Sequence, residues 1–587
     1  MGVYDDGVKI FMAKDALENP SSRQSDVSVE VIPAGTMGTP SGDVLATPEP
    51  VIEAVEQPKQ PSERRQIVKA ATLVMMGNLG SSVMGMVRQM VVASLGTNVA
   101  GPFVAALLPA RTFHTFIIDG AVSGVLIPTF NDYAAPEKRL ELRRLVFTLV
   151  NLVILIMLCA SIIFLFVSPA FISFLAQGFS SPQEKLLALH FAQIIFFSLV
   201  LLGPFSVLLA ALYALKEFGW PAFATVSYHV GIIIGALVSG LIGEHFIGNL
   251  GLAFGVLLGV CGEVALLIPG IVHQRLRYLF VLDLKHPALR RIPRLYGPVA
   301  LSFLISMGLV FLDQHLISLA PGDGVANSTA MSLATTLIQF PIGLVAAALS
   351  FAVLPTLAEH VRDGNMERFK ETLLLGFRLG LLLMIPAAAG LIALRMPIVT
   401  LIFRHGKFTF ANASLTASAL QNYAYQLPFV AIDQLLIAAF YARKNTLTPV
   451  IVGIISILGY LAVALPFWST IGIPALAFAN TVQNTLHAII LLVLLRMAIG
   501  SMSVRKTIPT VLKIIVATVA MIAVAWGLQS VLSHFSFFSI THLFGALFTV
   551  AIAGGLATGV YVGLILLFKV EEISLLKGAV LAKLGKK

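Results

Sequence analysis

The chain is 587 residues long, 57% of its residues are hydrophobic, and only 12% carry a charge. Its mean hydropathy of +0.91 lies far above that of a soluble protein, so the composition excludes a soluble enzyme. The net charge of +10 does not indicate a nucleic-acid-binding protein, because the basic residues cluster in the connections between apolar runs. We therefore expect an all-α polytopic membrane protein.

The N-terminal segment differs from the rest of the chain. Residues 1–65 are acidic, contain several prolines and show no periodic apolar face. Such a segment cannot bury enough apolar surface to fold alone, so we expect a disordered cytoplasmic tail. The tail is also a candidate site for a cytoplasmic partner.

Long apolar runs occupy most of the remaining chain. Runs of 18 or more residues, compared with a bilayer core of about 30 Å, predict fourteen transmembrane helices. The predicted spans are 66–95, 101–131, 143–168, 187–215, 221–242, 249–270, 295–320, 327–358, 372–394, 413–442, 447–468, 472–496, 508–533 and 542–568.

The basic residues predict the orientation of these spans. Of the 39 lysines and arginines, 32 fall in the two terminal segments and in the connections on the same side as the termini. The opposite side carries only Lys185, Arg395, Arg404 and Lys407. By the positive-inside rule, both termini are expected in the cytoplasm.

Two motifs recur at nearly the same spacing. The second span ends in LIPTFNDY (126–133) and the eighth in VLPTLAEH (353–360), with their prolines 227 residues apart. Tyr213 and Tyr441, near the ends of the fourth and tenth spans, are 228 residues apart. An offset of six helices gives two copies with the same orientation, and such parallel repeats are typical of transporters that bind substrate between their halves.

The repeat predicts the domain organisation. We expect two parallel six-helix lobes followed by two further helices. The predicted parts are an N-terminal lobe (66–270), a basic cytoplasmic linker (271–294), a C-terminal lobe (295–496), two extra helices (508–568) and an amphipathic tail on the inner leaflet (569–587).

A few ionisable residues lie within the predicted spans. An unpaired charge in hydrocarbon costs a few kcal/mol, so these residues should face a cavity or one another. With a rise of about 1.5 Å per residue, Arg88, Arg111 and Asp313 lie at similar depths, about 10 to 15 Å from the outer ends of their spans. The set is Arg88, Arg111, Asp313, His114, Asp119, His315 and Asp433, with Glu263 and Lys513 closer to the inner face.

Two interpretations of the arginines stay open at this point. Arg88 or Arg111 could form a structural ion pair with Asp313. Alternatively, the two guanidiniums could bind an anion, because the planar fork of arginine chelates a phosphate with two hydrogen bonds. Two arginines against one carboxylate leave a surplus of positive charge, which favours an anionic ligand.

The sequence lacks the motifs of common catalytic sites. It contains no Walker loop, no HExxH and no GxSxG. We therefore expect no enzymatic reaction, no metal and no cofactor. Asp119 and Asp433 are candidates for coupling transport to a cation or to the membrane potential.

Several stretches resemble the MurJ (MviN) lipid II flippase family, within the superfamily of multidrug, oligosaccharidyl-lipid and polysaccharide exporters. The resemblance spans about 66–568. Its most specific stretches are VMGMVRQMVVASLG (83–96), FVAALLPARTFHTFIIDGAVSGVLIPTF (103–130), IQFPIGLVAAALSFAVLPTLAEH (338–360), LIFRHGKFTFANASLTASAL (401–420) and LIAAFYARKNTLTPV (436–450).

The resemblance assigns roles in the first helix. Arg88 matches the second of two arginines that the family has there, and the first falls on Ser82. The acidic residue that follows in the family is Gln89 in this chain. Arg88 is thus expected to bind the substrate diphosphate.

The second and eighth helices depart further from the family. The family's paired arginines fall near His114, the basic residue at that place, with Arg111 close by. Asp119 replaces a glutamate, and Thr336 replaces an arginine of the eighth helix. The resemblance therefore implies a diphosphate site of Arg88, Arg111 and His114, within a less cationic cavity than the family usually has.

The resemblance also implies a function in cell-wall synthesis. Members of the family move an undecaprenyl-diphosphate-linked peptidoglycan precursor, lipid II, from the inner to the outer leaflet of the bacterial cytoplasmic membrane by alternating access. The lipid-linked saccharide and membrane lipids would be the partners, with the polyprenyl tail in a groove of 508–568. The alternatives are another lipid-linked oligosaccharide as substrate, a cation-coupled drug exporter, or a non-transporting scaffold.

Overall fold

The computed structural model describes residues 63–116, 125–242, 246–503 and 505–573. Within these ranges the chain forms helices joined by turns and short loops, with no β-strand, which confirms the all-α prediction. All described helices belong to one compact unit, Ser62–Lys587. The predicted tail 1–65 lies outside the described residues, apart from 63–65 at the start of the first helix.

The first half of the unit contains eight α-helices, in the part of the chain that the structure describes. They are α1 (Glu63–Ser94), α2 (Thr97–Thr115), α3 (Ile127–Asn131), α4 (Arg139–Leu175), α5 (Pro182–Phe196), α6 (Leu199–Ala214), α7 (Gly219–Ile242) and α8 (Phe246–His273). A short 3-10 helix, Pro136–Lys138, precedes α4.

The second half continues with α9 to α20. These are α9 (Pro287–Leu319), α10 (Gly324–Pro341), α11 (Ala347–Arg362), α12 (Met366–Ala393), α13 (Arg395–Phe403), α14 (Phe410–Ala424), α15 (Leu427–Ala442), α16 (Leu447–Phe467), α17 (Ile473–Ile499), α18 (Thr507–Ser533), α19 (Leu543–Thr549) and α20 (Gly555–Leu567). Two π-helical turns, Ile342–Ala346 and Val550–Gly554, join α10 to α11 and α19 to α20, and a short 3-10 helix, Ser536–Phe538, lies between α18 and α19.

Within the described residues, each predicted span coincides with a helix or with successive helices. Six spans of the C-terminal half, for example, match α9, α12, α16, α17, α18 and the broken run α19 to α20. Nine helices in the described ranges are long and apolar enough to cross a membrane, or ten if α14 and α15, which bend by 45°, form one span. The chain is thus a polytopic membrane protein, while the number fourteen stays a prediction.

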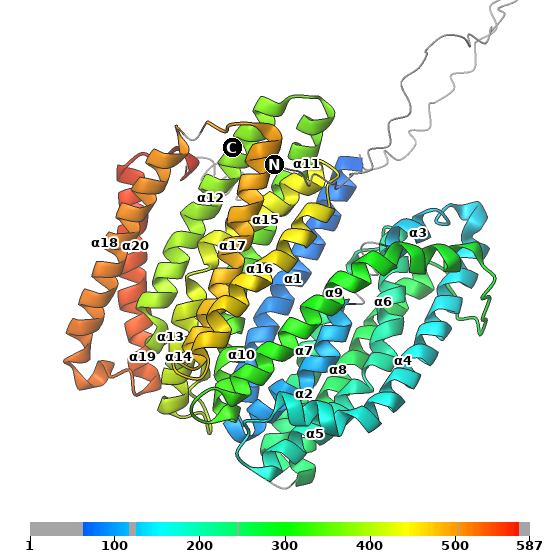
Figure 1. Cartoon of the computed structure of the whole chain (residues 1–587), viewed down its shortest axis with the longest axis horizontal. Helices are drawn as coiled ribbons and strands as arrows, with labels where there is room; N and C mark the ends of the chain where they lie inside the picture. The colour runs from blue at the N-terminus through cyan, green and yellow to red at the C-terminus, as the bar shows by residue number, and fades with distance from the viewer. Residues whose placement is uncertain (1–62, 117–124, 243–245, 504, 574–587) are drawn as a thin grey trace, which may run out of the picture. The chain divides into compact units, whose positions relative to one another are not determined.

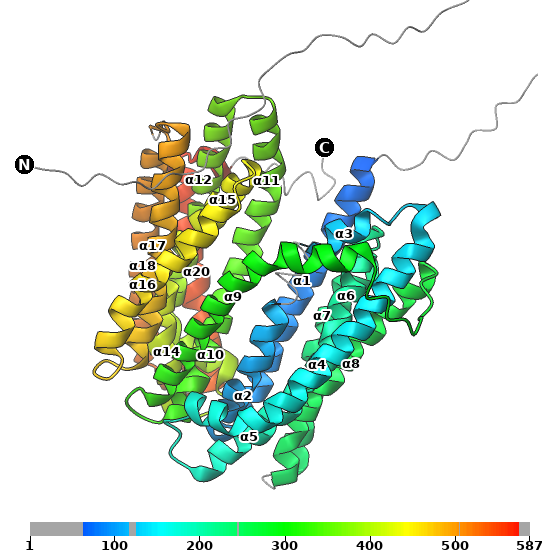
Figure 2. The ribbon, with the colours of Figure 1, turned by 45° about the vertical axis from the view of Figure 1, so that its right-hand side comes forward.

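The helices gather in two groups. Figures 1 and 2 show α4 to α8 on one side and α12 to α20 on the other, with α1 between them. α9 begins beside the first group and ends beside α10, so it connects the two (Figure 2). Separate apolar clusters fill each group, built around Phe191 and Phe205 in the first and around Phe403 and Phe369 in the second.

Glycines allow the closest helix packing. A Cβ atom at Gly235 of α7 would lie 2.6 Å from the Cα of Gly255 in α8, so only glycine fits this contact. A Cβ at Gly77 would collide with the backbone of Ala222, which brings α1 against α7. This packing places the inward faces of α1, α7 and α8 around one space.

The last two long helices are held to α12 and to each other by polar contacts. Arg378 of α12 forms a buried ion pair with Glu572, and its Nη1 also donates to Thr507 Oγ1 at 3.4 Å. Lys513 Nζ donates to the carbonyl oxygen of Phe568 at 2.8 Å. In Figure 1, α18 and α20 lie side by side beyond α12.

Candidate functional site

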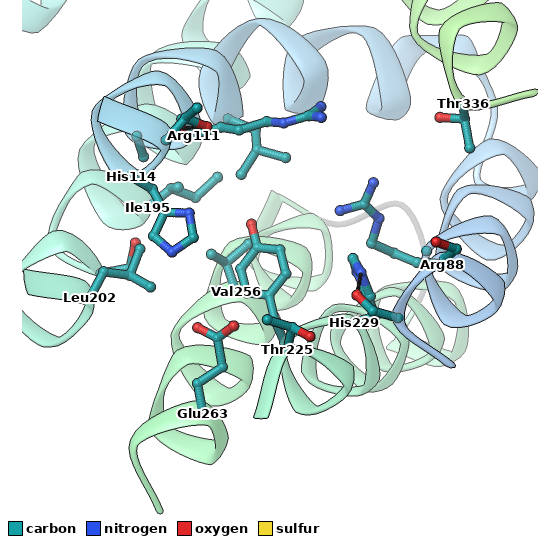
Figure 3. A pocket seen from close by; sticks show the side chains of 18 of the residues that line it. Arg88, Arg111, His114, Ile195, Leu202, Thr225, His229, Val256, Glu263 and Thr336 are labelled. Atoms are coloured by element: carbon teal, nitrogen blue, oxygen red, sulfur yellow. Dashed lines mark hydrogen bonds between the residues drawn. The ribbon is translucent and has the colours of Figure 1, made fainter. Parts of the chain in front are cut away.

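A cavity of about 330 Å³ lies where α1, α2 and α10 meet helices of the first group. Its walls come from α1, α2, α5, α6, α7, α8 and α10, and Figure 3 shows side chains that line it. A smaller pocket of about 160 Å³ shares Arg88 and Arg111 with it and extends toward α9 and α14. The two pockets together form a central site at the junction of the helix groups.

The two arginines predicted from the sequence meet in this cavity. Arg88 projects from α1 and Arg111 from α2, and Figure 3 shows both guanidiniums pointing into the open space. Arg88 is only 9% exposed. Within the described ranges, neither guanidinium has an ion-pair partner. Their charge is therefore available to a ligand.

Several buried polar atoms of the cavity have no hydrogen-bond partner. Buried polar groups in folded proteins are nearly always paired, so unpaired ones clustered at one place indicate a site for a ligand or water. Half of the unpaired atoms found in the described residues line this cavity: Arg88 Nε, His114 Nε2, Ser198 Oγ, His229 Nδ1 and Glu263 Oε2. The cavity is thus suited to a polar, hydrogen-bonding ligand.

Gln89 and Thr336 join α1 to α10 at the wall of the site. Gln89 Nε2 donates to Ser332 Oγ at 3.2 Å and to Thr336 Oγ1 at 3.1 Å. Thr336 lines both pockets. These two positions, at which the resemblance places charged residues, instead form a neutral hydrogen-bonded contact between α1 and α10.

Asp313 lies in the smaller pocket with both arginines, as the matched depths predicted. Its carboxylate accepts a hydrogen bond from the hydroxyl of Tyr460 in α16, which is almost completely buried. The ion pair with Arg88 or Arg111, one of the two interpretations that the sequence left open, does not form in this structure. Tyr460 instead supplies a donor at the carboxylate.

The other predicted residues lie elsewhere. Asp433 accepts from His487 Nδ1 at 2.7 Å, and His487 Nε2 contacts the Pro449 carbonyl oxygen at 3.1 Å. Because both ring nitrogens face oxygen acceptors, an imidazolium satisfies this arrangement. Asp433 lines neither central pocket, so the structure does not bring it to the site. Asp119 lies outside the described residues.

Glu263 of α8, one of the ionisable residues expected to face a cavity or one another, is 2% exposed and points into the cavity opposite Arg111 (Figure 3). Sequence reasoning missed other parts of the site. Tyr228 and His229 of α7 also line the cavity, and Ser81 Oγ of α1 lies 3.2 Å from His229 Nε2. The only sequence signal for them is a polar residue within an apolar run, which does not reveal the direction in which a side chain points.

The sequence model of the family described as lipid II flippase MurJ matches residues 91–548. The chain belongs to the MurJ family. A probable lipid II flippase MurJ of Bdellovibrio bacteriovorus is 25% identical over 473 residues, which cover 78% of this chain and 88% of the relative. One from Vibrio cholerae is 26% identical over 489 residues, which cover 80% and 91%.

Solved structures support the same fold. A lipid II flippase MurJ in an inward closed conformation superposes with a TM-score of 0.68 at 22% identity, covering 85% of this chain and 98% of the other. An inward-facing multidrug resistance transporter of the MATE family in the MOP superfamily gives 0.62 at 16% identity, covering 75% and 99%. The MurJ resemblance seen in the sequence is confirmed.

Proposed function

We propose that this chain moves lipid II from the inner to the outer leaflet of the bacterial cytoplasmic membrane. The observation that carries the proposal is the pair of unpartnered guanidiniums, Arg88 and Arg111, in one central cavity. Membership of the MurJ family, whose relatives are named as lipid II flippases, supports the same substrate. No chemical reaction is part of this function.

The arginines would bind the diphosphate of the substrate. Each guanidinium can form two parallel hydrogen bonds to phosphate oxygens, and both stay charged at every physiological pH. His114 lies beside Arg111 on α2 (Figure 3). It offers a third nitrogen to the ligand, because its Nε2 has no partner within the described ranges. Ser198 and His229 would then face the sugars, because hydroxyl and imidazole groups both donate and accept hydrogen bonds.

Transport would proceed by alternating access. The two helix groups would rock about the central site, with both termini in the cytoplasm as the positive-inside rule predicts. The polyprenyl tail would lie along α18 and α20, where apolar side chains such as Leu512, Val519 and Leu566 are exposed. Coupling to a cation or to the membrane potential is part of the proposal, with Asp313 as the carboxylate that lines the smaller pocket together with both arginines.

The test is rescue of cells depleted of their own lipid II flippase. Wild type should restore growth and expose lipid II to a probe confined to the outer leaflet. Arg88→Gln or Arg111→Gln should lower the rate of exposure roughly thirtyfold or more, because losing one partner of a buried charge contact costs about 2 kcal/mol or more.

The matched control is Arg496→Gln, which removes a charge from the exposed end of α17. It should transport as wild type does at equal membrane levels. Equal transport by the cavity variants and the control would refute a diphosphate site at Arg88 and Arg111. Growth rescue without exposure of lipid II would instead favour a scaffold.

A further inference from the structure

The central cavity holds a carboxylate as well as the two guanidiniums. Of the described residues that line the cavity of about 330 Å³, Glu263 of α8 is the one acidic residue. Figure 3 shows its carboxylate on the side of the cavity opposite Arg111, pointing into the open space. The cavity therefore has a basic side and an acidic side.

The carboxylate of Glu263 has no partner of its own. Its Oε2 is buried and accepts no hydrogen bond within the described ranges. No ion pair with a lysine, arginine or histidine of those ranges is found for this side chain either. Burying a carboxylate is costly unless a donor or a positive charge meets it, so this one indicates a place for a group of the ligand.

The acidic and basic sides face the same small space. Thr225 and Tyr228 of α7 are three residues apart, hence on one face of that helix, and both line the cavity together with Glu263. The side chain of Tyr228 lies within electrostatic range of Glu263 and of both arginines. One ligand can therefore contact the carboxylate and the guanidiniums at once.

The packing of α8 against α7 fixes the direction of Glu263. A Cβ at Gly259, one turn before Glu263, would lie 2.5 Å from the carbonyl oxygen of Tyr228, so only glycine allows this contact. Val256, two turns before Glu263, also lines the cavity, so this face of α8 is turned inward. A side chain on a fixed helix loses less freedom on binding, which favours affinity.

Charge balance identifies the class of ligand. The diphosphate of a lipid carries about two negative charges, which the guanidiniums of Arg88 and Arg111 balance. The carboxylate of Glu263 then needs a positive charge of its own. An amine on the same ligand supplies that charge, whereas a sugar hydroxyl donates a hydrogen bond and leaves the charge unpaired.

We propose that Glu263 binds an amine of the substrate headgroup, so that the cavity selects lipid diphosphates that carry a primary ammonium. The inference rests on the proposed function, because it takes the diphosphate at the two arginines as given. Glu263 is then a specificity-determining residue. The arginines bind any lipid diphosphate, and the carboxylate distinguishes those with an amine from those without one.

The test measures the affinity of the purified full chain in detergent for three lipids. These are lipid II with a lysine in its stem peptide, the same lipid II acetylated on the side-chain amine of that lysine, and undecaprenyl diphosphate. Wild type should bind the acetylated form about tenfold more weakly than the amine form, because a hydrogen bond between charged groups contributes at least about 1.4 kcal/mol.

Glu263→Gln keeps the size of the side chain and removes its charge. This variant should bind the two forms of lipid II equally, and it should bind undecaprenyl diphosphate as wild type does, which also shows that the variant is folded. Glu137→Gln is the matched control, because it removes an exposed carboxylate outside the cavity. The control should keep the tenfold difference between the two forms.

The outcomes separate this inference from the proposed function. If wild type binds undecaprenyl diphosphate but does not distinguish the two forms of lipid II, the amine site is refuted and the diphosphate site stands. If wild type binds none of the three lipids, the proposed function fails and this inference fails with it. A tenfold difference that persists in Glu263→Gln places the recognition of the amine elsewhere and overturns the proposal.

A free cation is the other possible source of the positive charge. Tetraphenylphosphonium, a lipophilic cation without a phosphate, serves as the probe for it. Wild type and Glu263→Gln should bind this cation equally weakly. Binding that Glu263→Gln abolishes, with the two forms of lipid II bound alike by wild type, would assign the carboxylate to a free cation and overturn the proposal.

Discussion

Removing the charge of Arg378 should release the last two long helices from α12. The ion pair between Arg378 and Glu572 is buried, with side chains 14% and 3% exposed. Arg378→Met leaves the Glu572 carboxylate without its partner in a dry environment, and breaking a buried ion pair from one side costs about 3 to 5 kcal/mol. Since 1.4 kcal/mol is a factor of ten, local opening should become at least about a hundredfold more frequent.

Hydrogen exchange of backbone amides in α18 and α20 measures this opening directly. In the purified full-length Arg378→Met variant in detergent, backbone amides of these two helices should exchange faster than in wild type. The exchange rates in α4 to α8 should be the same as in wild type. Arg378→Met combined with Glu572→Leu removes both charges and should exchange more slowly than the single variant, because an apolar pair of similar size costs little. If the single variant exchanges as wild type does, or if the double variant exchanges faster still, the ion pair is not what holds these helices.

Two further changes test packing and polar contacts within the bundle. Gly77→Ala should weaken the contact of α1 with α7, because its Cβ would meet the Ala222 backbone, whereas Gly559→Ala, which meets open space, should leave the melting temperature unchanged or slightly higher. Equal melting temperatures for the two alanine variants would contradict the close contact. Tyr460→Phe removes the hydroxyl that donates to Asp313 and should lower the unfolding free energy by about 1.5 to 3 kcal/mol, the range for a hydrogen bond to a charged group. A thermal unfolding curve that coincides with that of wild type would show that this hydrogen bond does not stabilise the fold.

Much of the site's composition was predictable, and the reason is the cost of burying charge. Arg88 and Arg111 stand out because a guanidinium in an apolar run must face a cavity or a partner. Helix depth, worked from the rise per residue, correctly placed Asp313 in a pocket with them. Depth along a helix does not specify rotation about its axis, and for this reason the sequence could not distinguish Asp313, in the pocket, from Asp433, bonded to His487 outside it.

The sequence by itself determined that the chain is helical and embedded in a membrane, and it located the long apolar helices. Both follow from local physics, because an apolar run in lipid must satisfy its backbone hydrogen bonds within itself. Tertiary structure alone decided which polar groups meet. The side chains of Glu263 and His229 line the same cavity, and Asp313 accepts a hydrogen bond from Tyr460 instead of forming an ion pair with an arginine. These outcomes depend on how helices distant in sequence are rotated and how closely they approach. Packing at glycines such as Gly77 and Gly235 sets this arrangement, and hydrophobic periodicity does not encode it.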